Sequence, residues 1–272
     1  MRQRIGRVAV YAVLGLAALT VLFPVYYAVA GAFMTPADLA SYPPALVPHR
    51  LTGANFGAAA AAVPLARQYL NSLVVATAVT AGQLLTSILA AYALVFLPLR
   101  RRGLVFGVFL ATLMVPWEAV LIPNYLTLSD WGLGNTYAGL VLPFLASGFG
   151  TFMLRQSFRQ FPAELRDAAR IDGAGHGRFL WRILVPLNKP VLAAIAVYVF
   201  LSAWNQYFWP LIITRTAQMQ TLQIGLTSLR TADAADPGLI LAGVLLSLLP
   251  TLVLVVFGQR FLVRGLTAGA VR

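Results

Sequence analysis

Long apolar runs follow one another along this chain, and they limit it to a small set of folds. Six segments each hold roughly 20 predominantly apolar residues. They extend approximately over Val8–Phe33, Tyr69–Leu97, Leu104–Pro123, Tyr137–Leu154, Val191–Ile213 and Leu239–Phe257. Charged residues make up only 10% of the sequence, whereas soluble domains contain about 25%. Because a helix satisfies its own backbone hydrogen bonds in lipid, the sequence predicts an all-α membrane protein with six transmembrane helices.

Prolines interrupt two of these segments. Pro116 and Pro123 fall in the third segment, and Pro143 falls in the fourth. Such breaks are tolerated where neighbouring helices or a cavity satisfy the freed backbone groups, so we expect both to be buried. The first segment is too long for a secretory signal and lacks a small-residue cleavage pattern, so we expect it to be retained as a span.

The placement of the basic residues predicts the orientation in the membrane. If both termini lie in the cytoplasm, 16 of the 20 lysines and arginines lie on that side. They are Arg2, Arg4, Arg7, Arg100–Arg102, the seven basic residues from Arg155 to Lys189, and Arg260, Arg264 and Arg272. Cytoplasmic segments carry such an excess. Basic residues that flank spans also account for the net charge of +12 without a nucleic-acid partner.

One strongly polar stretch, Pro162–Pro186, separates two of the apolar segments. Pro162 suits the first position of a helix, Glu164 complements the dipole of its first turn, and Gly173 suits the position just past its end. Helical spacing then places four residues on one face: Leu165, Ala168, Ala169 and Asp172. Two alanines keep this face slim enough to enter a groove. The pattern fits a helix that docks on another protein and, equally, an amphipathic connector that lies on lipid headgroups.

The same stretch resembles a known family signature. Asp167-Ala168-Ala169, then Gly173, then Ile183-Leu184-Val185-Pro186 is similar to the EAA motif of permease subunits of binding-protein-dependent ABC importers. The spacing matches throughout, with Asp167 in place of Glu and Val185 in place of Leu. Ala203–Ile212 and Gln259–Arg272 resemble the maltose-permease-type branch, which takes up carbohydrates. The resemblance covers essentially the whole chain.

The resemblance implies a type I ABC importer permease fold in the bacterial cytoplasmic (inner) membrane. This multi-pass chain would pair with a second, similar permease, two copies of a cytoplasmic ATPase and an extracytoplasmic solute-binding protein. ATP and Mg would be bound by the ATPase, and this chain would bind no cofactor. The residues that couple it to the ATPase would be Glu164, Asp167, Ala168, Ala169, Asp172 and Gly173.

The same resemblance implies a division of the chain into three parts. Residues 1–66 would form the first transmembrane helix and a periplasmic loop. Residues 67–260 would form a five-helix permease core with the coupling loop at about 160–188, and residues 261–272 would form a cytoplasmic tail.

The residues themselves indicate a transporter without a catalytic site of its own. The sequence contains no G-x-x-x-x-G-K-[ST] loop to cradle ATP phosphates. There is no cysteine, and His49 and His176 are too far apart in sequence to suggest a metal cluster. The alternative from another class is a self-powered secondary carrier. Such a carrier would need ionisable residues at mid-membrane or internal repeats, and neither is evident.

A polar and aromatic cluster in the fifth segment suggests a substrate path. Asn205 is the first choice for a residue lining it, followed by Trp204 and Tyr207, because amides and aromatic faces suit hydroxyl-rich rings. Contacts between helices explain these residues equally well. A phosphate would favour an Arg or Lys near the path, and the spans contain none. We therefore expect a di- or oligosaccharide, with glycerol 3-phosphate or a glycerophosphodiester as the alternative substrate.

Overall fold

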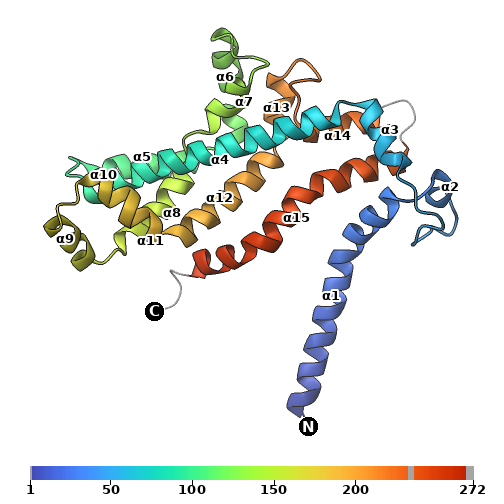
Figure 1. The fold of residues 1–272 in the computed structure, drawn as a ribbon, viewed down its shortest axis with the longest axis horizontal. Helices are drawn as coiled ribbons and strands as arrows, with labels where there is room; N and C mark the ends of the chain where they lie inside the picture. Colours follow the sequence, from blue (N-terminus) through green and yellow to red (C-terminus); the bar gives the residue numbers. More distant parts are fainter. Residues whose placement is uncertain (1, 232–235, 268–272) are drawn as a thin grey trace. The chain divides into compact units, whose positions relative to one another are not determined.

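The computed structural model describes residues 2–231 and 236–267, and within these ranges the regular structure is helical throughout (Figure 1). The elements are α1 (Arg2–Ala32), α2 (Pro36–Leu39), α3 (Ala54–Ala62), α4 (Leu65–Phe96), α5 (Arg102–Thr112), α6 (Trp117–Asp130), α7 (Tyr137–Val141), the 3₁₀ helix η1 (Leu142–Phe144), α8 (Gly148–Arg159), α9 (Ala163–Ile171), α10 (His176–Phe179), the π-helical turn η2 (Leu180–Leu184), α11 (Val185–Leu187), α12 (Lys189–Trp204), α13 (Phe208–Ile213), α14 (Leu222–Thr231) and α15 (Pro237–Thr267). The predicted all-α class is confirmed. Residues 232–235 and 268–272, the latter at the end of the predicted tail, lie outside the described part.

Three of the predicted spans are continuous helices. They are Val10–Ala32, Leu65–Phe96 and Pro237–Leu254, and each is long and apolar enough to cross a membrane. Three further candidates are bent pairs: Arg102–Thr112 with Trp117–Asp130 at 95°, Tyr137–Phe144 with Gly148–Arg159 at 47°, and His176–Leu187 with Lys189–Trp204 at 78°. The described residues therefore contain three straight spans, and six if each bent pair counts as one.

The proline breaks differ from the expectation that both would be buried. Pro116 lies at the N-cap of α6 in extended conformation, so no helical hydrogen bond is lost there. Pro123 lies inside α6, and both residues are exposed on this single chain. Pro143 lies in the first turn of η1 and is half-buried. At Pro116 and Pro143 the reason is local, because a proline at the start of a helix replaces an amide that has no intrahelical partner anyway. Pro123 does not follow this rule, because it lies inside α6.

The described chain divides into two compact units. One comprises the residues up to Ala66 together with Leu222–Leu249, and the other comprises Arg67–Thr221 together with the chain from Pro250 onwards.

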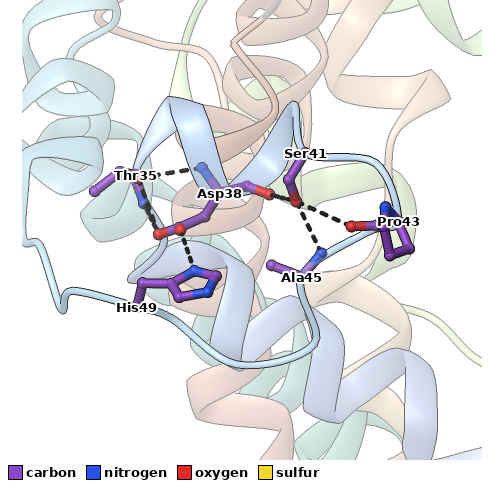
Figure 2. A network of polar contacts seen from close by, with 6 residues as sticks. All are labelled: Thr35, Asp38, Ser41, Pro43, Ala45 and His49. Atoms are coloured by element: carbon purple, nitrogen blue, oxygen red, sulfur yellow. Dashed lines mark hydrogen bonds and ion pairs between the residues drawn. The ribbon is translucent and has the colours of Figure 1, made fainter.

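The first unit contains a short polar cap around α2. Thr35 and Asp38 form a reciprocal capping box, in which the Thr35 hydroxyl accepts from the Asp38 amide and the Asp38 carboxylate accepts from the Thr35 amide, both at 3.2 Å. The Thr35 hydroxyl also donates to this carboxylate at 2.9 Å. His49 Nδ1 lies 2.7 Å from the other carboxylate oxygen (Figure 2). Asn55 is buried and donates to the carbonyls of Ala32 and Met34, both at 2.9 Å, which ties α3 to the end of α1.

The second unit is built around α4 and a core of buried side chains. Its most buried members include Val75, Ala91, Leu140, Leu154, Phe158, Leu184, Trp209 and Ile213. The indole N–H of Trp209 donates to the carbonyl of Gly139 at 3.0 Å, and its ring packs edge-on against Trp117 and Phe144. A Cβ on Gly139 would lie 2.2 Å from the Leu133 carbonyl oxygen. Only glycine therefore allows this close packing of α7.

Candidate functional site

The predicted coupling helix is formed by α9, Ala163–Ile171. Pro162 precedes the helix in extended conformation, one position earlier than predicted. The helix ends as the sequence predicts. Gly173 takes a left-handed φ of 70°, its N–H donates to the carbonyl of Arg170, and the N–H of Ala174 donates to the carbonyl of Ala169 at 2.9 Å. This is a Schellman C-cap, in which glycine avoids the strain that other residues meet at positive φ.

The exposed face of α9 differs from the predicted face. Ala169 is only 6% exposed and belongs to the core of the second unit. Glu164, Asp167, Ala168 and Ile171 are exposed and recur at the spacing of one helix face, with Ile171 87% exposed. Leu165 and Asp172 are also exposed beside this face. The sequence-based assignment missed Ile171, because its predicted stripe was centred one position away.

Aromatic packing holds the segment after α9 against the second unit. Phe179 is buried and packs edge-on against Phe96 at 5.4 Å and Phe161 at 5.6 Å between ring centroids. The hydroxyl of Tyr92 lies 2.6 Å from Nδ1 of His176. The chain continues as α10, η2 and α11, and this helical segment meets α12 at a bend of 78°. The loop is thus a packed structure with one exposed helix face.

The polar cluster in the fifth apolar segment is not one continuous helix. α12 ends at Trp204, Asn205 is its C-cap, and α13 begins at Phe208. The residues of this cluster therefore do not lie on one helix. Trp204 is 1% exposed and packs against Tyr69 at 5.3 Å and Phe200 at 6.0 Å. Asn205 is exposed, and its Nδ2 donates to the Leu201 carbonyl at 2.8 Å.

A cavity of about 290 Å³ lies beside this break, within the second unit. Its polar lining residues are Gln83, Ser147, Tyr198, Ser202 and Gln206, and its apolar lining includes Val79, Trp117, Phe144, Phe149, Val199 and Ala203. Trp204, Asn205 and Tyr207 are not among the residues that line it. Gln206, the residue between Asn205 and Tyr207, is the one that reaches the cavity. The cluster predicted from the sequence thus adjoins a cavity, but the helix break places Gln206, rather than Asn205, in the cavity lining.

Two amides of α4 have different roles. Asn71 is buried, donates to the carbonyls of Gln218 and Gln220 at 2.7 and 2.8 Å, and accepts from the Tyr137 hydroxyl at 2.6 Å. Its hydrogen-bonding capacity is used in holding the chain together. Gln83, three helical turns further along α4, instead lines the cavity.

Comparison with known proteins identifies the family. A model of the binding-protein-dependent transport system inner membrane component matches residues 83–267. The chain belongs to this family. It is thus an ABC importer permease of the bacterial inner membrane, and the predicted membrane location and class of transporter are confirmed. As a membrane component of a transport system, this permease is not expected to carry a catalytic activity of its own.

Named relatives cover nearly the whole permease. The sn-glycerol-3-phosphate transport system permease protein UgpE of Agrobacterium fabrum is 39% identical over 271 residues, 96% of each chain. UgpE of Brucella abortus is 39% identical over 263 residues, 93% of each chain. UgpE of Yersinia pestis is 39% identical over 256 residues, 91% of each chain.

One solved structure shows the fold. A chain of a bacterial ABC transporter involved in the import of the acidic polysaccharide alginate aligns with a TM-score of 0.85 at 24% identity, and the match covers 96% of this permease and 97% of that chain. The predicted ABC importer permease fold is therefore confirmed.

Proposed function

We propose that this permease carries glycerol 3-phosphate, or a closely related glycerophosphodiester, across the inner membrane. The observation that carries the proposal is 39% identity over 96% of both chains to a glycerol-3-phosphate permease. This relationship favours the alternative substrate of the sequence analysis over the di- or oligosaccharide expected there. The absence of Arg and Lys from the spans was a weak guide, because neutral donors also bind phosphate oxygens.

The cavity beside α12 fits a small polar substrate. Gln83 and Gln206 supply amide donors, and Ser147, Ser202 and Tyr198 supply hydroxyls, opposite an apolar wall. Such a lining, mostly apolar with a few convergent polar groups, is typical of small-molecule sites. Hydrogen bonds to an anion are stronger than those between neutral groups, so these donors would contribute more to a phosphate than to a hydroxyl.

A neutral sugar is the second candidate for the substrate, and the lining of the same cavity supports it. None of the residues that line the cavity is Lys, Arg, Asp or Glu. Amides and hydroxyls beside aromatic rings also suit a sugar ring. A phosphate substrate would then need its charge balanced by groups outside this cavity.

The energy for transport would come from partner subunits. The importer would contain a second permease, two copies of an ATPase that binds ATP and Mg, and a solute-binding protein. In this assembly Glu164, Asp167, Ala168 and Ile171 would contact the ATPase, because they form the exposed face of α9. Ala169 would seat the helix on the permease, Asp172 would flank the contact, and Gly173 would end the helix. A small two-state change at the ATPase could then be passed on through the packed loop.

The substrate is tested by uptake into vesicles that contain the complete importer and its solute-binding protein. Labelled glycerol 3-phosphate should be taken up in an ATP-dependent manner, and unlabelled glycerol 3-phosphate or a glycerophosphodiester should compete. Maltose at the same concentration should not compete. Uptake of labelled maltose, without uptake of glycerol 3-phosphate, would instead establish the sugar and reject the proposal.

The assignment of this chain's cavity is tested separately with Gln206→Leu. The variant should keep the stimulation of ATP hydrolysis by loaded binding protein but lose most uptake. Normal uptake by this variant would remove the cavity from the path without deciding the substrate.

A further inference from the structure

A second cavity shares no lining residue with the substrate candidate. Its volume is about 290 Å³, and it is lined by Leu94, Val95, Arg102, Arg155 and Arg159. These residues come from the end of α4, the start of α5 and the last turns of α8, all within the second unit. α5 and α8 are in direct contact. Three guanidinium groups therefore converge on one small space with an apolar floor.

The positive charge in this cavity is not neutralised by the described part of the chain. The ion pairs found there join His49 with Asp38 and Arg166 with Asp167, so none involves the three arginines. Arg102 and Arg159 both act on Arg155 as like charges. Like charges in close proximity destabilise the site unless an anion lies between them. An anion between the three side chains would reduce this repulsion.

The Arg155 side chain is held in place, but one of its hydrogen-bond donors has no partner. Its guanidinium carbon lies 3.8 Å from the centre of the Phe106 ring, which fixes the side chain by a cation–π contact. Its Nε is buried and has no hydrogen-bond partner. A buried donor without a partner is costly, and arginine presents its donors in a fixed fork that matches phosphate oxygens. Protein atoms cover Nε, so such an oxygen would bind the terminal nitrogens of the Arg155 guanidinium.

The surroundings of the cavity favour a lipid as the source of the phosphate. Leu94 and Val95 form its floor, and α5 presents Leu104, Val105 and Val108 as exposed apolar side chains beside Arg102. The three arginines lie on the predicted cytoplasmic side, at the ends of apolar segments, where headgroups lie. Basic pockets between transmembrane helices on that side bind acidic headgroups. We propose that Arg102, Arg155 and Arg159 bind the phosphate group of an anionic phospholipid.

The test uses the complete importer, purified in detergent and titrated with phosphatidylglycerol, with bound lipid measured by native mass spectrometry. The wild type should retain the lipid, and diacylglycerol, which lacks the phosphate, should not compete. Arg155→Gln and Arg159→Gln should each weaken binding about tenfold, as expected for loss of a charge-assisted hydrogen bond. Arg155→Lys should lose less lipid binding, because lysine keeps the positive charge and lacks only the forked donors of the guanidinium. Arg159 is exposed, so Arg159→Gln is informative even if Arg155→Gln does not assemble.

Arg100→Gln is the matched control, because Arg100 is an exposed basic residue near the same helix end and does not line the cavity. It should bind lipid as the wild type does. An equal loss of lipid binding in this control and in Arg159→Gln, or no loss of lipid binding in any variant, would overturn the proposal. Displacement of the lipid by millimolar inorganic phosphate would keep the phosphate site but reject the lipid as its source. Loss of pairing between the two permeases in Arg159→Glu, with lipid binding unchanged, would assign the cavity to a partner's carboxylate instead.

Discussion

The hydroxyl of Tyr92 and Nδ1 of His176 lie 2.6 Å apart, so one hydrogen bond joins α4 to the loop that follows α9. The two residues are 84 positions apart in the sequence. Tyr92 is buried near the end of α4, and His176 begins α10. This hydrogen bond therefore ties α4 to the segment that directly follows the predicted coupling helix.

Tyr92→Phe is expected to loosen this connection. The change removes the hydroxyl and keeps the ring packing, so the free energy of unfolding should fall by about 1 kcal/mol. Uptake should fall more than ATP hydrolysis does, so that less substrate is taken up per ATP hydrolysed. A double-mutant cycle with His176→Ala checks the link, because residues in contact show non-additive effects. Additive losses in stability and in uptake would show that the two side chains do not act together.

Gly173 should tolerate asparagine better than alanine or valine. Its φ of 70° strains residues that carry a Cβ by about 1–2 kcal/mol, whereas asparagine visits this region more readily. The space around Gly173 is open, so side-chain size should not decide the outcome. We expect uptake in the order glycine, asparagine, alanine, valine, measured at equal amounts of assembled importer. Gly175→Ala is the control, because its surroundings are also open but its φ is −69°. An order set by side-chain volume alone, with alanine above asparagine, would contradict the backbone argument.

The cap around α2 should weaken in acid. The hydrogen bond from His49, followed by that from Thr35, lowers the pKa of the Asp38 carboxyl from its ordinary value of 3.8. A lowered pKa means that the stabilisation is complete above the unfolded value and is lost as the pH falls through the folded value. Hydrogen exchange of the amides in residues 35–41 should therefore accelerate below about pH 4.

The control for this prediction is the Asp38→Asn variant. It should exchange faster at pH 7 and, once corrected for the intrinsic rate, change little down to pH 3. Asp130→Asn, at an exposed carboxylate at the end of α6, should behave as the wild type. A wild-type cap whose exchange, corrected for the intrinsic rate, is constant down to pH 3 would rule out this role of Asp38.

Gln206→Leu should impair uptake more than Asn205→Leu. Gln206 lines the cavity beside α12, whereas Nδ2 of Asn205 bonds to the Leu201 carbonyl at the helix end. Removing one hydrogen bond to the substrate should lower uptake by about threefold to tenfold. Labelled substrate uptake at several concentrations measures the effect, and the amount of assembled complex controls for folding. A larger loss of uptake in Asn205→Leu, with intact assembly, would indicate that Asn205 lines the substrate path.

Single cysteines should report the predicted orientation. The sequence has no cysteine, so Gly57→Cys and Gly175→Cys each introduce one thiol. Both positions are exposed and have open space for a side chain. The distribution of basic residues predicts that Gly57 faces outside and Gly175 faces the cytoplasm. A membrane-impermeant maleimide should label only Gly57→Cys in intact spheroplasts and both variants after lysis. Labelling of both in intact spheroplasts would refute the predicted orientation.

The sequence by itself determined the membrane class, the continuous spans and the end of α9. Apolar runs as long as the bilayer leave a helix as the only solution, because lipid offers no partners for backbone groups. Gly173 after Ile171 ends α9, because the left-handed position favours glycine. These features depend on the properties of residues that are close together in the sequence.

Tertiary structure alone decided which side chains face which surroundings. The break between Trp204 and Phe208 places Gln206 at the cavity and buries Trp204, although all three lie in one apolar segment. Core packing buries Ala169 and leaves Ile171 exposed, which rotates the exposed face of α9 away from the predicted one. The approach of α5 and α8 gathers three arginines from distant parts of the sequence. A periodic pattern gives the relative angle between neighbours on one helix, but the direction of that helix and the position of its breaks depend on the partners that pack against it.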